Sequence, residues 1–163
     1  MKYLGSKTLE TDRLILKAQT MEEQKYLWSI LMKPDVNKYY LTVPKKFSEK
    51  LKDWNKQEEY YKNDMEHAND LDVFRWSIFI KETGQCIGRV SCHPASDENC
   101  EINNPNIRGV GWFIDPKFKG NGYGNEAAQA MMDYMFTECE IDEIRTGAAI
   151  QNPASWKIME KFG

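Results

Sequence analysis

A glycine-rich turn between an apolar run and an alanine-rich segment most constrains what this chain can fold into. Residues 110–114 (VGWFI) predict a buried strand, and Asp115-Pro116 predicts the turn that ends it. A basic loop follows over residues 117–124 (KFKGNGYG), and a helix is expected from Asn125. Glycines let backbone N–H groups converge, and the unpaired amides of a helix's first turn carry the positive end of its dipole. This strand–loop–helix unit predicts a site for a phosphate or pyrophosphate.

The spacing of the glycines narrows the choice of phosphate ligand. No Gly-Lys-Ser/Thr occurs in the chain, which excludes a P-loop. Gly120 and Gly122 fit the first two glycines of the dinucleotide fingerprint G-x-G-x-x-G, but its third position falls on Asn125. The loop also lies in the last third of the chain rather than in a first βα unit. A glycine turn that only leads into a packing helix is the structural alternative.

The same loop resembles a known coenzyme A site. Residues 119–124 (KGNGYG) are similar to the [Q/R]-x-x-G-x-[G/A] pyrophosphate loop of the GNAT acetyltransferases. Lys119 replaces the usual Gln or Arg, which keeps the charge but loses the planar, bidentate geometry. The resemblance implies that acetyl-CoA is the cosubstrate. The residues that would hold its pyrophosphate are Lys119, Gly120, Asn121, Gly122, Tyr123, Gly124 and Asn125.

Two further segments resemble the ribosomal-protein N-terminal acetyltransferase branch of that superfamily. Residues 151–163 (QNPASWKIMEKFG) are similar to its N-x-x-S…E-K-x-G signature, and residues 10–16 (ETDRLIL) are similar to its first strand, E-T-x-R-L-x-L. Three motifs in the right order cover most of the chain. They imply a single GNAT domain over residues 1–163. Its fold is α/β, with a central mixed, mostly antiparallel sheet that is flanked by helices and whose fourth and fifth strands splay apart.

Periodicity places the elements in the order β-α-α-β-β-β-α-β-α. Alternating and apolar runs predict the strands, and apolar residues at helical spacing predict the helices. Pro34 is expected to end the first helix, which begins at Thr20, and a loop is expected after it. The expected strands cover residues 9–17, 73–81, 86–93, 109–114 and 144–150, the later helices residues 48–67, 125–136 and 152–162, and the polar loops residues 35–46 and 97–106.

The resemblance also implies roles around the splayed strands. It places the pantetheine arm along the backbone of Trp112, Phe113 and Ile114, with the Phe113 N–H polarising the thioester carbonyl. Asn152 would reach the arm from the other side of the gap, or serve only as a helix cap. Ser155 would assist the leaving thiolate, or only complete the capping of the helix's first turn.

The general base is not evident from the sequence. The family's usual acid is a tyrosine seven residues after the Asn, and Met159 stands there instead. Many relatives carry a glutamate just before the central strand, where this chain has Arg108-Gly109. Four residues nearby in sequence could act through water, or be ordinary solvated side chains: His93, Asp97, Glu98 and Glu101.

The acceptor is expected to be a primary amine. No Ser-His-Asp or Cys-His nucleophile pattern is present, so the amine would attack the thioester directly in a ternary complex. By resemblance, Tyr39-Tyr40 and residues 48–67 would form the acceptor wall, and a protein N-terminus would be the acceptor. A small-molecule amine, such as an antibiotic or a polyamine, is the first alternative. A non-catalytic coenzyme A sensor is the second.

Composition excludes several classes of partner. A net charge of −3 gives no reason to bind nucleic acid or an anionic membrane. No apolar run approaches the roughly 20 residues of a membrane-spanning helix, and residues 1–5 (MKYLG) do not open a signal peptide. The four cysteines lack C-x-x-C spacing, which predicts reduced thiols, no metal and a cytoplasmic location. A monomer and a homodimer both fit these features.

The last residue, Gly163, is a typical helix C-cap. Related chains continue from this point with two more strands. We therefore expect the C-terminal strands of the fold to be truncated here, disordered, or supplied by a domain-swapped partner.

Overall fold

A computed structural model describes residues 1–40, 52–66, 72–97, 100–101 and 103–162. Within these residues, most of the strands predicted from periodicity are present with nearly the predicted bounds. The main strands are β1 (Leu9–Glu10), β2 (Leu14–Ala18), β3 (Phe74–Ile80), β4 (Cys86–Pro94), β7 (Ile107–Ile114) and β8 (Glu143–Arg145).

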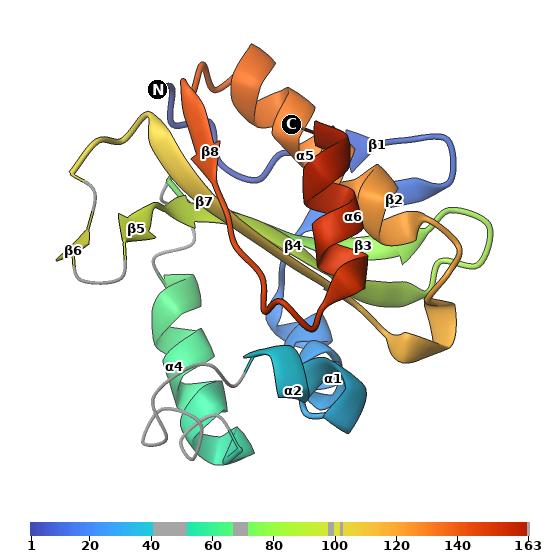
Figure 1. The fold of residues 1–163 in the computed structure, drawn as a ribbon. Helices are drawn as coiled ribbons and strands as arrows, with labels where there is room; N and C mark the ends of the chain where they lie inside the picture. The colour runs from blue at the N-terminus through green and yellow to red at the C-terminus, as the bar shows by residue number, and fades with distance from the viewer. Residues whose placement is uncertain (41–51, 67–71, 98–99, 102, 163) are drawn as a thin grey trace.

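These strands form one six-stranded sheet in the order β1-β2-β3-β4-β7-β8 (Figure 1). Neighbouring strands are antiparallel except β7 and β8, which are parallel. The mixed, mostly antiparallel sheet predicted from the resemblance is confirmed. A short separate ladder joins β5 (Ser96–Asp97) and β6 (Cys100–Glu101) within the segment expected to be a polar loop.

The strand predicted over residues 9–17 is in fact two strands with a sharp turn between them. The turn is closed locally, because the N–H of Thr11 donates to the carbonyl of Leu14 at 3.0 Å and the Leu14 N–H donates to the Thr11 hydroxyl at 2.9 Å. β1 and β2 therefore pair with each other as a hairpin, with Leu9 opposite Leu16. The sequence does carry a trace of this turn, because residues 10–13 (ETDR) are all polar and the buried leucines shift from an odd position, Leu9, to even positions, Leu14 and Leu16.

The first helix, α1 (Met21–Leu31), begins as predicted. Thr20 and Glu23 form a reciprocal capping box at its N-terminus. The loop predicted after Pro34 is wrong in its first part, because Pro34 begins a further helix, α2 (Pro34–Tyr40). Proline is favoured at the first position of a helix, and here it both separates α1 from α2 and starts the second helix.

The helix predicted over residues 48–67 is present as α4 (Trp54–Glu66). Its predicted first residues, like residues 41–46 of the predicted loop, lie outside the described residues. Trp54 of α4 packs against Trp28 of α1, with 5.4 Å between the ring centroids. This aromatic contact joins the two helices on one side of the sheet.

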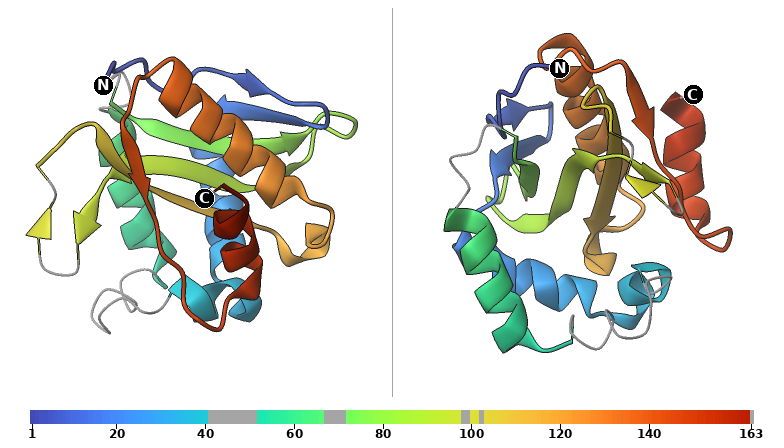
Figure 2. Two further views of the ribbon diagram at one scale, coloured as in Figure 1. Left: turned by 45° about the horizontal axis from the view of Figure 1, so that its top comes forward. Right: turned by 90° about the vertical axis from the view of Figure 1, so that its left-hand side faces the viewer.

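Helices cover both faces of the sheet (Figure 2). α1, α2 and α4 lie on one face. α5 (Tyr123–Thr137) crosses the other face, and α6 (Pro153–Phe162) lies beside the N-terminal half of α5. Ala127 and Ala128 on α5 are fully buried, which lets this helix lie close to the sheet. The main core fills the layer between α5 and the apolar side chains of β2, β3 and β4.

The parallel pair β7–β8 is only three residues long. Residues 107–109 pair with residues 143–145, and the two chains then diverge. The strand predicted over residues 144–150 is therefore wrong beyond Arg145, because the segment that follows leaves β7. Thr146 makes a last contact, its hydroxyl donating to the Val110 carbonyl at 3.1 Å. The divergence opens a gap between β7 and the edge strand β8, as the splayed strands of the resemblance implied.

The layer under α5 gives a direct test of the fold. Met131 is fully buried there, so Met131→Ala should lower the free energy of unfolding by about 2–5 kcal/mol through lost transfer energy and a cavity. Phe136 on the same helix is 43% exposed, and Phe136→Ala is the matched control with an expected loss below about 1 kcal/mol. Urea unfolding measures both, and equal losses would contradict this packing.

Candidate active site

Asp115 fixes the start of the glycine loop to the rest of the molecule. Its side chain is 1% exposed. It accepts hydrogen bonds from the Lys33 ammonium at 2.7 Å, the Tyr26 hydroxyl at 3.0 Å and the Lys117 N–H at 3.1 Å. The last bond caps the short 3₁₀ helix Pro116–Phe118, which leads into the loop. A single buried carboxylate thus ties α1 and the end of β7 to the loop.

The charges around Asp115 favour its ionised form. Burial by itself raises the pKa of Asp115, but hydrogen bonds from Lys33, Lys117 and Tyr26 outweigh burial and lower the pKa below its ordinary value of 3.8. Burial and the bond to Asp115 raise the pKa of Tyr26 to about 12. Tyr26 is therefore a protonated donor at neutral pH, and the cluster serves as an anchor rather than as a proton acceptor.

A second contact clamps the far end of the loop. The Arg13 side chain forms an ion pair with Glu126 at 2.6 Å, donates to the Asn121 carbonyl at 2.9 Å and lies 4.7 Å from the centre of the Tyr123 ring. Glu126 also accepts from the hydroxyl of Thr11. Two motifs far apart in sequence, residues 10–16 and residues 119–126, are therefore parts of one structural unit. These contacts give Glu126 a structural role at the start of α5.

The loop between these two anchors has the form of an anion cradle. Gly120 and Gly122 have φ values of 82° and 79°, which residues with a Cβ rarely adopt. Gly122 is the N-cap of α5, and no side chain caps this helix. Its first-turn N–H groups are therefore available to an anion. The Asn121 side chain has a different role, since its amide donates to the Phe118 carbonyl at 3.1 Å and closes the loop on itself.

The backbone of β7 alternates between its two neighbours. The N–H of Asp115 donates to the Ile87 carbonyl in β4 at 2.7 Å. The Val110 carbonyl instead accepts from Thr146, on the side of β8. Peptide groups in an antiparallel ladder alternate in direction from one residue to the next. Odd-numbered residues of β7 therefore face β4, and even-numbered residues face the gap.

This alternation changes one detail of the predicted site. Phe113 pairs with Arg89, so its N–H points to β4 and not into the gap. The backbone groups of Trp112 and Ile114 face the gap, where no strand pairs with them among the described residues. The register is consistent with pantetheine binding by Trp112 and Ile114, two of the three predicted residues. It also favours their N–H groups, rather than that of Phe113, as donors of a hydrogen bond to the thioester carbonyl.

Asn152 and Ser155 meet at the N-terminus of α6. The Asn152 side chain accepts from the Ser155 N–H at 3.4 Å and donates to the Ser155 hydroxyl oxygen at 3.0 Å. Asn152 therefore caps the helix, as one of its two predicted roles requires. Because the Ser155 oxygen accepts this bond, its hydroxyl hydrogen can be donated to another group.

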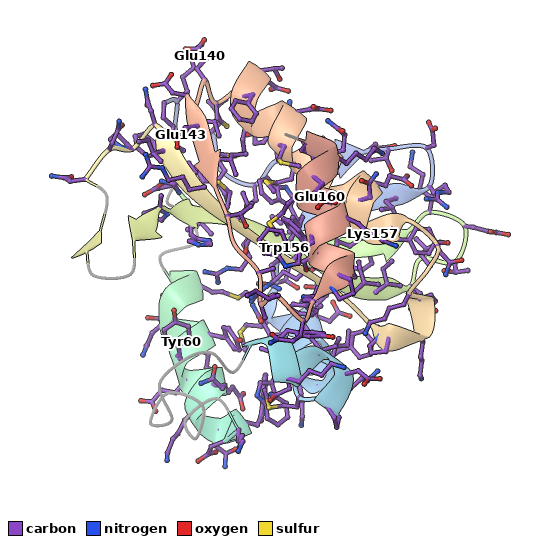
Figure 3. The ribbon with its side chains drawn as sticks, viewed as in Figure 1. Tyr60, Glu140, Glu143, Trp156, Lys157 and Glu160 are labelled. Carbon is purple, nitrogen blue, oxygen red and sulfur yellow. The ribbon has the colours of Figure 1, made fainter. Side chains whose placement is uncertain are left out.

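Three parts of the site converge at Gly124. A Cβ at this position would contact side-chain carbons of Ile114 on β7 and Ile158 on α6, each at 3.5 Å. The helix start, the strand end and α6 therefore lie within van der Waals reach of one another. Figure 3 shows α6 in front of the sheet through its labelled side chains, Trp156, Lys157 and Glu160. Ile114 of β7 and Ile158 of α6 thus both border the start of α5.

The opposite face of the sheet, under α1 and α4, carries polar side chains. Ser77 of β3 pairs with Arg89 of β4, which in turn pairs with Phe113 of β7. Two residues along the same strands, Arg75 pairs with Ser91. Tyr61 of α4 is 6% exposed, and its pKa is raised by burial and lowered in part by Arg89 and Arg75. Its neighbour Tyr60, labelled in Figure 3, is 57% exposed. α4 thus presents one of two adjacent phenols to the sheet.

His93 is the one general-base candidate whose side chain is described. Its pKa is lowered by desolvation and by the charges of Arg108, Arg89 and Arg75, so it is neutral near pH 7. However, it pairs with Gly109, four residues before Phe113, which is roughly 13 Å along a strand. That distance exceeds direct proton transfer. The side chains of the other three candidates, Asp97, Glu98 and Glu101, lie outside the described residues.

The sequence did not reveal the two anchors of the loop. Asp115 was read only as a turn residue, and Lys33 and Tyr26 carried no signal because they lie more than 80 residues away. Arg13 and Glu126 were each within a predicted element, but their pairing depends on the fold. A buried acid directly after an apolar strand is the one signal that could have indicated an anchor at Asp115.

Comparison with known proteins identifies the family. The family described as Acetyltransferase (GNAT) domain matches residues 13–163. The protein YkkB of Bacillus subtilis (strain 168) is 29% identical over 162 residues, covering 98% of this chain and 87% of that protein. The chain belongs to the GNAT acetyltransferase family. It is an N-acetyltransferase with a fold that uses acetyl-CoA.

Solved structures share this fold. A putative ribosomal-protein-serine acetyltransferase from Vibrio cholerae has a TM-score of 0.69 at 17% identity, covering 100% of this chain and 84% of that one. Spermidine N-acetyltransferase from Vibrio cholerae, in complex with CoA and spermine, has a TM-score of 0.72 at 21% identity, covering 94% and 81%. Acetyltransferases named for quite different acceptors are thus equally similar in fold.

Among residues 1–40, 52–66, 72–97, 100–101 and 103–162, no three His, Cys, Asp or Glu side chains are grouped so that they could hold a metal ion. No helix in the same residues is long and apolar enough to cross a membrane.

The anchor at Asp115 predicts a dependence of stability on pH. Its folded pKa lies below the ordinary value of 3.8, so its stabilisation is complete above that value and is lost as the pH falls through the folded pKa. Asp115→Asn should lower the free energy of unfolding by about 1–3 kcal/mol at pH 7. The difference from wild type should shrink as the pH falls below 3.8.

Urea unfolding at pH 7 and at several values below pH 4 measures this effect. Asp12→Asn, at an exposed position in the β1–β2 turn, is the matched control and should leave stability within about 0.5 kcal/mol. A difference between Asp115→Asn and wild type that stays constant over the whole pH range would contradict the anchor.

Proposed function

We propose that this protein transfers the acetyl group of acetyl-CoA to a primary amine by direct attack in a ternary complex. The observation that carries the proposal is the uncapped N-terminus of α5, with two left-handed glycines before it, directly beside the gap between β7 and β8. A cradle for a pyrophosphate and a slot for an extended arm are adjacent there. The family membership supplies the reaction class.

The cradle residues have distinct parts in this proposal. The first-turn N–H groups of α5 bind the pyrophosphate, and the exposed Lys119 adds charge. Gly120 and Gly122 shape the loop, and Asn121 closes it. The remaining predicted residues, Tyr123, Gly124 and Asn125, form the start of α5, where the Tyr123 ring packs under Arg13.

Backbone groups of β7 orient the reacting arm. Trp112 and Ile114 turn their peptide groups into the gap, so they can bind an extended chain as a neighbouring strand would. An N–H of this pair, aimed at the thioester carbonyl, would stabilise negative charge that develops on its oxygen. Ser155 would donate its hydroxyl hydrogen to the leaving sulfur, at a helix N-terminus that itself favours negative charge.

The acceptor class is a separate part of the proposal. The resemblance of residues 10–16 and 151–163 to ribosomal-protein acetyltransferases supports a protein N-terminus. A neighbour in fold named a spermidine N-acetyltransferase supports a small amine. A transfer screen with acetyl-CoA against N-terminal peptides, aminoglycosides and polyamines tests both. Binding of coenzyme A without transfer to any amine would favour the sensor alternative.

The pyrophosphate cradle predicts the effect of a methyl group at Gly122. Gly122→Ala strains a left-handed residue by about 1–2 kcal/mol and disturbs the N–H groups of the loop, so acetyl-CoA should bind at least about tenfold more weakly. Gly84 has a similar φ of 67°, in a hairpin remote from the loop, with open space around it. Gly84→Ala is therefore the matched control. Calorimetric titration that gives one affinity for both variants would contradict the placement.

The contacts of Ser155 separate its catalytic role from its structural one. The Asn152 side chain caps α6 through the Ser155 N–H, which Ser155→Ala keeps. We therefore expect little loss of stability, unchanged acetyl-CoA affinity, and a kcat lowered by up to roughly 10²-fold. Turnover at saturating acetyl-CoA measures this, with Ser29→Ala on the exposed side of α1 as the control. An unchanged kcat would mean that Ser155 has only a structural role at the start of α6.

A further inference from the structure

The sheet face under α1 and α4 is more polar than a packed layer requires. Ser77 is completely buried, yet its hydroxyl has no hydrogen-bond partner among the described residues. Gln24 of α1 is also buried, and its amide nitrogen is without a partner in the same residues. Buried polar atoms are nearly always paired in proteins, so unpaired ones indicate a group that is supplied from outside. Both lie in the layer that faces away from α5.

Arg89 is the central charge of this face. It stands directly across the ladder from Ser77 on one side and from Phe113 on the other, and its guanidinium lies 5.2 Å from the centre of the Phe113 ring. A hydrogen bond links it to Tyr61 of α4. No carboxylate among the described residues pairs with it. A half-buried arginine that is held in place without a counter-ion suits the binding of an external anion.

The surrounding charges strengthen this positive potential. Arg75 lies on the same face. Desolvation and the charge of Arg108 lower the pKa of His93 most, and Arg89 and Arg75 lower it further. Among the acidic side chains on the covering helices, Glu23 belongs to the α1 capping box, and Glu58 of α4 pairs with Lys62 at 2.9 Å. The described part of this face therefore favours a negative group.

The position of Arg89 relates this anion to the reaction. Adjacent strands lie about 4.8 Å apart, so Arg89 is one strand spacing from Phe113, whose neighbours Trp112 and Ile114 turn their backbone groups to the other side of β7. Under the proposed function these groups hold the thioester. A ligand whose anion meets the guanidinium of Arg89 would thus have its amine only a few bonds away from that anion.

We propose that the acceptor amine carries a carboxylate or a phosphate within a few bonds of the reacting nitrogen, and that Arg89 binds this anionic group. The inference rests on the proposed function and narrows its substrate class. The nitrogen–carbon bond forms as the carbon–sulfur bond breaks, the amine proton passes to solvent, and coenzyme A leaves as the thiol. Arg89 takes no part in these bonds and acts by binding and orienting the acceptor. A polyamine, which has only positive groups to offer, would be repelled.

Matched acceptor pairs test this inference. The first pair is O-phosphoethanolamine and ethanolamine, and the second is a pair of peptides that begin with Asp or with Asn and are otherwise identical. Spermidine is the cationic reference. The anionic member of at least one pair should have a kcat/KM about tenfold to hundredfold higher, the range expected for a charged hydrogen bond. A preference within the first pair indicates a phosphate as the anionic group, and a preference within the second pair indicates a carboxylate.

Variants connect the preference to Arg89. Arg89→Gln should abolish it by raising KM for the anionic acceptor, with acetyl-CoA affinity and turnover of the neutral acceptor retained, and Arg89→Lys should restore part of it. Lys17→Gln removes a charge from the same sheet face, where Lys17 lies over the Phe79 ring, and should leave the preference unchanged. Higher kcat/KM for spermidine or for the neutral partners in wild type would overturn the inference and leave the proposed function intact.

Direct binding covers the case in which no amine in the panel is acetylated. The protein saturated with coenzyme A is titrated with O-phosphoethanolamine and with ethanolamine. Tighter binding of the anionic compound to wild type than to Arg89→Gln would support the inference even if transfer fails. Equal binding to the two proteins would overturn it. Failure of coenzyme A itself to bind would instead count against the proposed function.

Discussion

The parting of β7 from β8 is the constraint on which the rest of the site depends. A parallel ladder that stops after three residues leaves the backbone groups of Trp112 and Ile114 without strand partners in the described sheet, on the side of β7 that faces the edge strand β8. Such groups are costly to leave unpaired. The end of β7 is fixed by the bond from Lys33 to Asp115, and the segment that leaves β8 runs into the capped N-terminus of α6.

The two carboxylates that hold the loop prepare it for an anion. Asp115 binds Lys33, and Glu126 binds Arg13, so each acid is neutralised by a nearby base before any ligand arrives. Their own negative charges are thereby prevented from opposing a pyrophosphate at the N-terminus of α5. A loop fixed in this way loses little conformational entropy on binding. The anchors thus serve both the electrostatics and the rigidity of the cradle.

Local signals in the sequence predicted the parts of the site, and long-range contacts determined how they fit. Glycines, the Asn-Pro cap and alternating strands revealed the loop, α5 and α6, because each signal acts within a few residues. The turn at Thr11 and the helix that begins at Pro34 were missed, because a run of polar residues (ETDR, residues 10–13) does not by itself distinguish a turn from a solvent-facing strand, and because a proline can end one helix or begin the next. The N–H of Phe113 points to β4, whereas those of Trp112 and Ile114 point away from it. This difference depends on the pairing of β7 with β4, which no local sequence pattern reveals.

The distribution of charge explains how one small domain could bind two anionic ligands. The net charge of −3 suggests no affinity for anions, yet the cradle at α5 and the guanidinium of Arg89 are both locally positive. They lie on opposite faces of the sheet, so the two anions would be separated by a packed layer. Interactions between charges near a surface also weaken strongly beyond about 10 Å in physiological salt. Repulsion between the ligands would then be small, while each still meets its own positive group. Under the proposed function, the reactive ends of the two ligands would meet at the gap in the sheet.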